Sequence, residues 1–448
     1  MIGNLSAIIS LASCHKIAES QPVSVQPVPP QTIVRPTDVR PLPGKLDNVP
    51  MVNSNSPEWL KKEGILLSTF PAIGKADPKA HLGYPLSGQF EYFDHHYILN
   101  PPDLKTIYIG IVAYNPGRDP IQLTIPDAAS NLVLPLPGTT PRPYGDGTRV
   151  SDAILKGVHS PDIPKSILIP PQTYRMLLNQ PIPVKGLKRP LNGRSTHLRL
   201  NSRNAKTNEP ALIYVASLAM YAKFLPNGQE QAPTLTAWTT LLNQGNLAQP
   251  RDKTPTPPQA VGGSLVYGRV SGVQQGSRWA ANLTSPNREV LNLPTPDKPI
   301  SYALSTLRGG NFGTKQVQAA TLLVRYGDTA YEAHGNYDVH YDLTAPLYNN
   351  SDRPQTVKVF IETPLNLANN TSLTFHQKAT SSAVFAGLVR LRYKDDTGQP
   401  VEQYVTVKQQ RGQITQPLLT VALQPKETRP VQVDFLYPPD STPPQVLT

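Results

Sequence analysis

The residues best suited to chemistry lie in the segment 334–342, which reads HGNYDVHYD. In an extended strand alternate side chains share one face, so His334, Asp338, His340 and Asp342 would point the same way. Imidazoles and carboxylates gathered like this can bind a divalent metal ion. However, side chains two residues apart stand about 7 Å from each other, which is wide for a shared ion. The segment predicts either a metal site completed by further ligands or, as we favour, the polar outer face of a half-buried strand.

A basic stretch forms the second candidate site. The formal net charge of the chain is +11, and residues 185–206 contain no acidic residue. Such a surface attracts anionic polymers or lipid headgroups, although a solvated loop and strand face would have the same composition. It lacks the interleaved aromatic residues of a nucleic-acid surface, so we expect no nucleic-acid partner. The candidate ligand-binding residues are Lys185, Lys188, Arg189, Arg194, Arg199 and Arg203.

Residues for nucleophilic catalysis are scarce. The chain has a single cysteine, Cys14, and no Gly-x-Ser-x-Gly elbow. Ser195 and His197 lie close together in the sequence, but no acid stands near them to complete a triad. We therefore name no catalytic residue and no cofactor. A hydrolase remains the least favoured of three functions.

Cys14 itself suggests where the protein works. Residues 1–14 form a short apolar stretch that ends in Leu-Ala-Ser-Cys, the pattern of a bacterial lipoprotein box. A lipid on this thiol would anchor the protein to a membrane. The stretch lacks the Lys or Arg that usually precedes an apolar core, so an ordinary signal peptide or an incidental cysteine are alternatives. We predict export to the cell envelope, the periplasm or outer membrane, with lipid attachment at Cys14.

Composition excludes several classes of protein. The 448 residues include 50 prolines, about twice ordinary usage. A single cysteine excludes a disulfide scaffold, and this much proline argues against a helical bundle, because proline breaks helix interiors. The proline-rich segment 15–50 predicts a stiff tether after the signal segment.

The remaining chain predicts a mainly β fold with two β-sandwich-like domains and a few short helices. We expect a β-rich domain over 51–250 and a second sandwich over 263–440, divided by the Pro- and Gly-rich segment between them. A capped helix is expected at 234–244, another at 56–64, and a hairpin turn at 395–398.

The two expected domains share a short sequence motif. Tyr114-Asn115 and Tyr348-Asn349 each close a strand, and a proline follows Asn115 and Asn349 five residues later. The next strand begins directly after that proline in the first copy and two residues after it in the second. Asparagine can cap such a turn, and proline suits an edge that needs no donor. Either an internal duplication or convergent turn chemistry would produce this pattern.

Several longer phrases resemble an uncharacterised family of exported cyanobacterial cell-envelope proteins, a domain of unknown function. The resemblance covers nearly the whole chain after residue 35, and it implies an envelope setting but no activity. The phrases are VRPLPGKLDNVP (39–50), NSNSPEWLKKEGILLSTFP (53–71), LNGRSTHLRL (191–200), SLAMYA (217–222), AHGNYDVHYDL with PLYNN (333–350), QQRGQ (409–413) and VQVDFLYPPDSTPPQVLT (431–448).

Together these features predict a non-catalytic envelope protein, lipid-anchored or secreted, with a structural or interaction role. Its partners would be a membrane, through the lipid, and an anionic cell-wall polymer or another envelope protein. A carbohydrate- or anionic-polymer-binding module is the alternative.

Overall fold

The computed structural model is mainly β, as the sequence predicts, with 46% of residues in strands and 6% in helices. Cys14 and the rest of the signal segment lie outside the residues that it describes. No helix within the described ranges is long and apolar enough to cross a membrane. Those ranges are 31–134, 147–249, 251–260, 263–378, 383–439 and 441–448.

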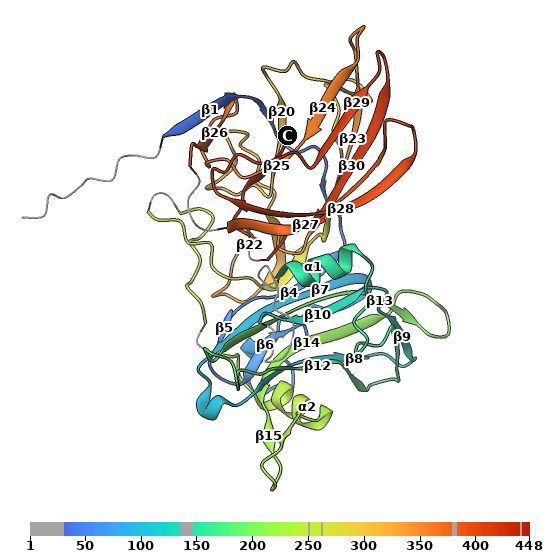
Figure 1. Cartoon of the computed structure of the whole chain (residues 1–448). Helices are drawn as coiled ribbons and strands as arrows, with labels where there is room; N and C mark the ends of the chain where they lie inside the picture. The colour runs from blue at the N-terminus through green and yellow to red at the C-terminus, as the bar shows by residue number, and fades with distance from the viewer. Residues whose placement is uncertain (1–30, 135–146, 250, 261–262, 379–382, 440) are drawn as a thin grey trace, which may run out of the picture.

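The first half of the molecule is a two-layered sandwich whose layers belong to one continuous 14-stranded sheet (Figure 1). One layer has the order β12-β8-β14-β6, and β14 passes into the other layer by pairing with the start of β7. The strands are β4 (Pro50–Ser54), β5 (Trp59–Leu60), β6 (Gly64–Ser68), β7 (Leu86–Leu99), β8 (Ile107–Tyr114), β9 (Ile121–Thr124), β10 (Ala128–Leu132), β11 (Ser166–Ile169), β12 (Tyr174–Ile182), β13 (Leu191–Asn204), β14 (Leu212–Tyr221), β17 (Ser271–Gln275), β21 (Ala320–Arg325) and β22 (Glu332–Ala333).

The second half contains three further sheets. The seven-stranded sheet comprises β3 (Lys45–Leu46), β18 (Arg278–Asn282), β19 (Leu291–Asn292), β23 (His340–Tyr348), β27 (Ala383–Lys394), β28 (Pro400–Gln410) and β30 (Thr428–Leu436). The four-stranded sheet comprises β2 (Asp38–Arg40), β20 (Ile300–Leu304), β31 (Gln445–Leu447) and β25 (Ile361–Glu362). The paired strands β24 (Gln355–Val359) and β29 (Leu419–Leu423) extend this layer, because β25 follows β24 directly.

Two smaller ribbons complete the sheets. The strand β1 (Thr32–Pro36) pairs with β26 (Ser372–His376), and β15 (Lys223–Phe224) pairs with β16 (Glu230–Gln231). Short 3₁₀ turns lie at Pro78–Ala80 and Pro102–Leu104.

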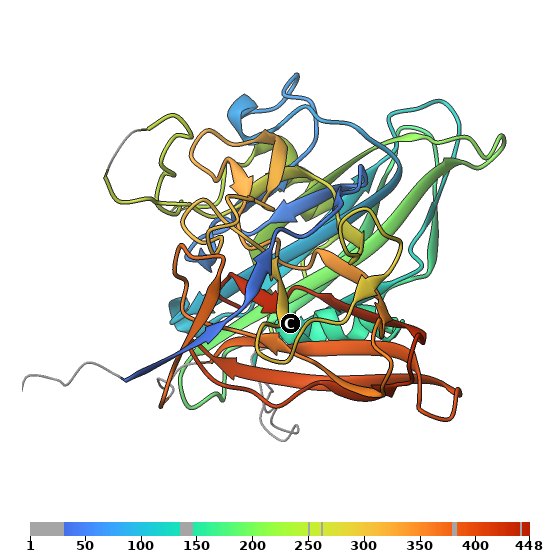
Figure 2. The same cartoon turned by 90° about the horizontal axis from the view of Figure 1, so that it is seen from above.

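Strand pairing differs from the expected domain division in two places. Part of the expected tether, 32–46, forms β1, β2 and β3, which pair with strands of the second half (Figures 1 and 2). Leu42 is 1% exposed, so this proline-rich segment is fixed by burial of its apolar side chains. Conversely, β17 from beyond residue 263 pairs with β4 in the first sheet. The two halves therefore exchange strands.

Two α-helices lie in the described ranges. The helix α2 (Leu235–Gln244) covers the outer face of β8 and β14, and Thr234 caps it by accepting a hydrogen bond from the N–H of Ala237 at 3.2 Å. The helix expected at 56–64 is absent; β5 stands there, because Leu60 is buried beside β7. The helix α1 (Gly147–Leu155) lies between the two halves and contacts β13 and β27 (Figure 1).

The Tyr-Asn motif shared by Tyr114-Asn115 and Tyr348-Asn349 forms the same corner in both places. Asn115 Nδ2 donates to the carbonyls of Asp119, Ile169 and Pro170 at 2.8–3.2 Å. Asn349 Nδ2 donates to the carbonyls of Arg353, Leu423 and Gln424 at 2.8–3.1 Å. Both asparagines are 0% exposed. The strands around them correspond too: β8, β9, β11 and β12 pair as β23, β24, β29 and β30 do.

Equivalent corners should respond equally to mutation. We expect Asn115→Ala and Asn349→Ala each to lower the free energy of unfolding by about 2–3 kcal/mol, because each leaves buried carbonyls without a donor. Urea denaturation followed by circular dichroism measures both. Asn227→Ala, in the exposed β15–β16 turn, is the control and should change stability by less than about 0.5 kcal/mol. A large loss in only one corner would contradict their equivalence.

Candidate functional site

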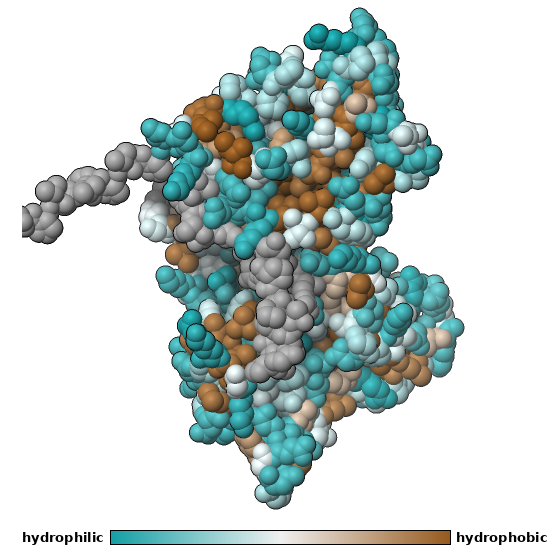
Figure 3. Space-filling view, viewed as in Figure 1, coloured by the Kyte–Doolittle hydropathy of each residue, from teal (hydrophilic) through white to brown (hydrophobic). Residues whose placement is uncertain are grey.

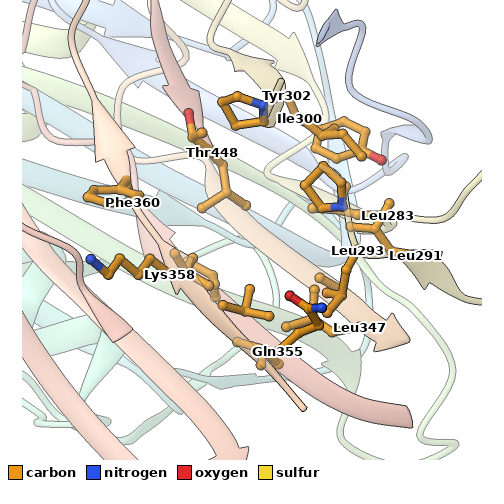
Figure 4. Close-up of a pocket in the computed structure, with 18 of the residues that line it drawn as sticks. Leu283, Leu291, Leu293, Ile300, Tyr302, Leu347, Gln355, Lys358, Phe360 and Thr448 are labelled. Carbon is orange, nitrogen blue, oxygen red and sulfur yellow. The ribbon is translucent and has the colours of Figure 1, made fainter. Parts of the chain in front are cut away.

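An apolar cavity lies inside the second half, between the seven-stranded sheet and the layer containing β24 and β31. It has a volume of about 330 Å³ and opens to solvent. Figure 4 shows Leu291, Leu293 and Leu347 on one side of it, facing Thr448 and Ile300 on another. In Figure 3 a hydrophobic area is visible on the upper part of the molecule, over the sheets of the second half. The apolar lining residues are Leu283, Leu291, Leu293, Pro294, Pro296, Pro299, Ile300, Tyr302, Leu343, Ala345, Leu347, Val357, Val359, Phe360, Val431, Val433 and Leu447.

Strand alternation explains the apolar floor. Leu343, Ala345 and Leu347 occupy every second position of β23, and they lie beside Val431 and Val433 of β30. Ala345 is the smallest of these side chains and stands in the middle of the floor, which leaves room above it. The other four side chains are only 0–5% exposed, so Ala345 is the point at which the floor is open.

The mouth of the cavity carries positive charge. Arg35 lines it but is held in a salt bridge with Glu362, whose side chain is only 1% exposed. Lys358 is exposed and points away from the leucines in Figure 4. Among the ion pairs between described residues, none includes Lys358. Lys358 is therefore a cation at the rim without a described carboxylate partner.

The corresponding space in the first half is filled. Leu123 and Ile125 are the counterparts of Val357 and Val359, and both are 0% exposed, whereas Val359 is 9% exposed. Phe90 from β7 and Leu200 from β13 belong to the same packed core as Leu123 and Ile125. The same corner can thus be closed by side chains, and in the second half it is left open.

A buried charge cluster joins the two halves. His197 on β13 is 0% exposed and lies between two carboxylates: Nε2 is 2.8 Å from Glu91 on β7, and Nδ1 is 3.0 Å from Asp338. Burial alone would lower the pKa of His197, but the two carboxylates outweigh it and raise the pKa to about 9. Likewise, burial would raise the pKa of Glu91, yet His197 and Arg199 lower it. We call His197, Glu91 and Asp338 the charge clamp.

The clamp does not have the geometry of a catalytic triad. Ser151 on α1 hydrogen-bonds to Asp338 rather than to His197, and both nitrogens of His197 face carboxylates. In a triad the histidine must contact the serine. Contacts between serine and histidine do occur elsewhere, at Ser54–His96, Ser68–His81 and Ser195–His95, but each of these three serines is 0% exposed. A substrate carbonyl has no access to such hydroxyls.

The four candidate metal ligands do not share a strand face. The strand β22 ends at Ala333 and β23 begins at His340, so the expected extended segment is a turn, in which Asp338 has φ 59°. His334 stacks on Tyr267, and Asp338 contacts His197. On β23, His340 contacts Asp434, and Asp342 pairs with Arg278. Among the described residues, no three His, Cys, Asp or Glu side chains gather closely enough to hold a metal ion.

The basic stretch divides into separate parts. Lys185, Lys188 and Arg189 are exposed in the loop between β12 and β13. On β13 itself, Arg194 is buried and donates to the carbonyl of Pro181, whereas Arg199 pairs with Glu91 and Asp127. Arg203 donates to the carbonyl of Asn208.

A second cavity, of about 440 Å³, lies between the halves beside the clamp. Four arginines line it, but each is matched by a carboxylate: Arg199 by Glu91, Arg278 by Asp342, and both Arg390 and Arg392 by Asp434. Burial would raise the pKa of Asp434, yet hydrogen bonds from His340 and Arg390 lower it. Each of the four arginines is already paired with a carboxylate, so we name no anion site in this cavity.

These features define a mainly β protein of two interwoven sandwiches, one closed and one with an open apolar cavity. The chain belongs to the DUF3370 family, described as a protein of unknown function, whose sequence model matches residues 37–448. No curated protein matches the sequence.

Proposed function

We propose that the protein is a non-catalytic binding protein of the cell envelope, and that its cavity takes up an apolar group of a ligand. The observation that supports this proposal is the cavity of about 330 Å³, whose lining is mainly apolar and consists largely of leucine, valine, isoleucine and proline side chains. Ligand pockets in proteins span roughly 300–1,000 Å³ and are mostly apolar. An apolar space of this size binds an apolar group more favourably than it holds water.

The closed corner of the first half supports this proposal. Natural cores are packed without voids larger than a water molecule, because lost contacts cost stability. The first half shows that the corner can be packed, since Leu123 and Ile125 are fully buried there. An open version in the second half is therefore better explained by binding than by a fold that cannot close.

The envelope location rests on the sequence. We propose export and lipid attachment at Cys14 because Leu-Ala-Ser-Cys matches a lipoprotein box. A lipid anchor would hold the binding protein at a membrane surface. Mass spectrometry of the native N-terminus tests this, and a mature chain that starts at unmodified Met1 would contradict it.

An anionic cell-wall polymer is a second candidate ligand. The exposed group Lys185, Lys188 and Arg189 supports it, because three cations in one loop attract polyanions. The remaining members of the basic stretch are engaged with protein groups. The loop alone would therefore make this contact, and charge reversal at its three residues should abolish retention on an anionic polymer resin.

The cavity is tested with N-phenyl-1-naphthylamine, an uncharged dye that fluoresces in apolar surroundings. We expect the full chain to bind it, and Ala345→Trp to weaken binding by about tenfold or more, because the indole fills the space above the floor. Val431→Phe fills the same space with a smaller ring. Thr420→Trp, at an exposed position of β29, is the matched control and should leave binding unchanged. Equal binding by all folded variants would refute the proposal.

A further inference from the structure

We propose that an extended peptide segment of a partner protein adds as a strand to the free edge of β24, with its apolar side chains in the cavity. This inference rests on the proposed function, that the cavity takes up an apolar group, and names the chemical class of the ligand. Strand addition is a general mode of peptide recognition, in which backbone hydrogen bonds give affinity and pockets for alternate side chains give specificity.

The backbone beside the cavity is ready for such a strand. Among the described strands β24 pairs with β29 alone, and residues 355–360 line the cavity. Phe360 and Thr448 exchange two backbone hydrogen bonds, at 2.8 and 2.9 Å, where the β25–β31 ladder ends. Because backbone groups alternate along a strand, Thr356 and Lys358 point their N–H and C=O groups to this same side. Within the described residues, no backbone group pairs with them there.

The duplicated corner shows which element would occupy this edge. In the first half β9, the counterpart of β24, pairs with β11 on one side and with β13 on the other. In the second half β29 takes the place of β11, but no strand of the described ranges takes the place of β13 beside β24. Leu198 and Leu200 of β13 are buried in the core of the first half. An added strand would cover the apolar floor in the same way.

The free edge of β24 also determines the direction of an added strand and the pattern of its side chains. A strand that continues the line of β31 runs antiparallel to β24, as β13 runs antiparallel to β9. Its residue opposite Val357 points into the cavity and should be apolar. Its residue opposite Lys358 points outward, and an acidic side chain there forms a cross-strand ion pair. The expected segment is therefore apolar–acidic–apolar.

An acyl chain is the competing occupant. It would fill the apolar space, but it would form no hydrogen bonds with the N–H and C=O groups of Thr356 and Lys358. A peptide can place apolar side chains against the floor and also form backbone hydrogen bonds with the edge of β24. The observations therefore favour a peptide.

The test uses the full chain and the peptide Val-Glu-Val-Thr-Ser, amidated and dye-labelled at its C-terminus, with binding followed by fluorescence anisotropy. Its first valine lies opposite Val359, so the pairing of Phe360 with Thr448 is left intact. An ester in place of the glutamate amide removes the N–H that would donate to Lys358, and we expect about fivefold weaker binding. The same ester at the last serine removes an N–H that points away from β24, and it should have little effect. Lys358→Glu should weaken the peptide a few-fold, and a peptide with lysine for glutamate should restore binding to that variant.

The outcomes separate this inference from the function on which it rests. Equal effects of the two esters, or no rescue by the charge swap, would overturn strand addition. If the peptide does not bind but dodecanoate displaces N-phenyl-1-naphthylamine, the ligand is an acyl chain and the apolar site stands. If Ala345→Trp changes the binding of none of these probes, the proposed function itself fails.

Discussion

The His197→Ala variant is expected to lose about 3–5 kcal/mol of unfolding free energy, the cost of removing one partner from a buried ion cluster. The substitution leaves Glu91 and Asp338 facing each other without the imidazolium that lies 2.8 and 3.0 Å from them. Asp338 is 0% exposed and so has no water to replace the lost partner. Since Glu91 and Asp338 come from different halves, the loss should affect unfolding of the whole molecule.

A second substitution distinguishes charge from packing. In the wild type, Asp338→Asn breaks the clamp and should destabilise the fold. In the His197→Ala background the same change removes an uncompensated buried charge, so it should recover stability. Asparagine tolerates the positive φ of position 338, which makes the comparison clean. Urea denaturation measures all four proteins, with Arg203→Ala on the same strand as the control. A further loss in the double variant would show that packing rather than charge holds the clamp.

Local signals in the sequence predicted local structure well. Thr234 caps α2 as its position before the apolar spacing indicated, and Asp395 holds the β27–β28 turn through the N–H groups of Thr397 and Gln399. The segment 56–64 carried similar helix signals but became a strand, because Trp59 and Leu60 pair with β7. Tertiary pairing overrides local propensity at such positions.

The clamp could not be predicted in the same way. Its members are separated by more than 100 residues along the chain, and only the pairing of β13 with β7 brings His197 and Glu91 together. The sequence did indicate that His197 lacked a nearby acid. It placed Asp338 on a strand with His340, whereas a turn directs Asp338 to His197.

The cavity could not be predicted from the sequence either. Its floor follows from alternation along β23 and β30, which was readable for Val431 and Val433. Its openness depends on a strand that the first half has and that no described segment supplies in the second half. The sequence of the residues that such a strand would contact does not show that the strand is absent.

The clamp should also make stability depend on pH above neutrality. The pKa of His197 is raised from 6.5 to about 9 in the folded protein, so its stabilisation is complete below pH 6.5 and is lost as the pH rises to about 9. The loss across this window is on the order of 3 kcal/mol. Burial lowers the pKa of His81, His96 and His334 to about 4, 3 and 4, so these residues titrate below the window.

The measurement is the free energy of unfolding in urea at half-unit steps from pH 7 to 9. In the wild type it should fall steadily, because the unfolded chain releases its proton from His197 first. In His197→Gln, which keeps a polar side chain but cannot titrate, the curve should fall only where Asp94 still titrates and should be flat from about pH 8 to 9. Asp94, whose pKa is raised by burial to about 7, is about half protonated at pH 7 and adds the same falling slope to both proteins up to about pH 8, so the difference between the two curves reports His197. A wild-type curve as flat as that of His197→Gln would show that His197 is not held as an imidazolium between its two carboxylates.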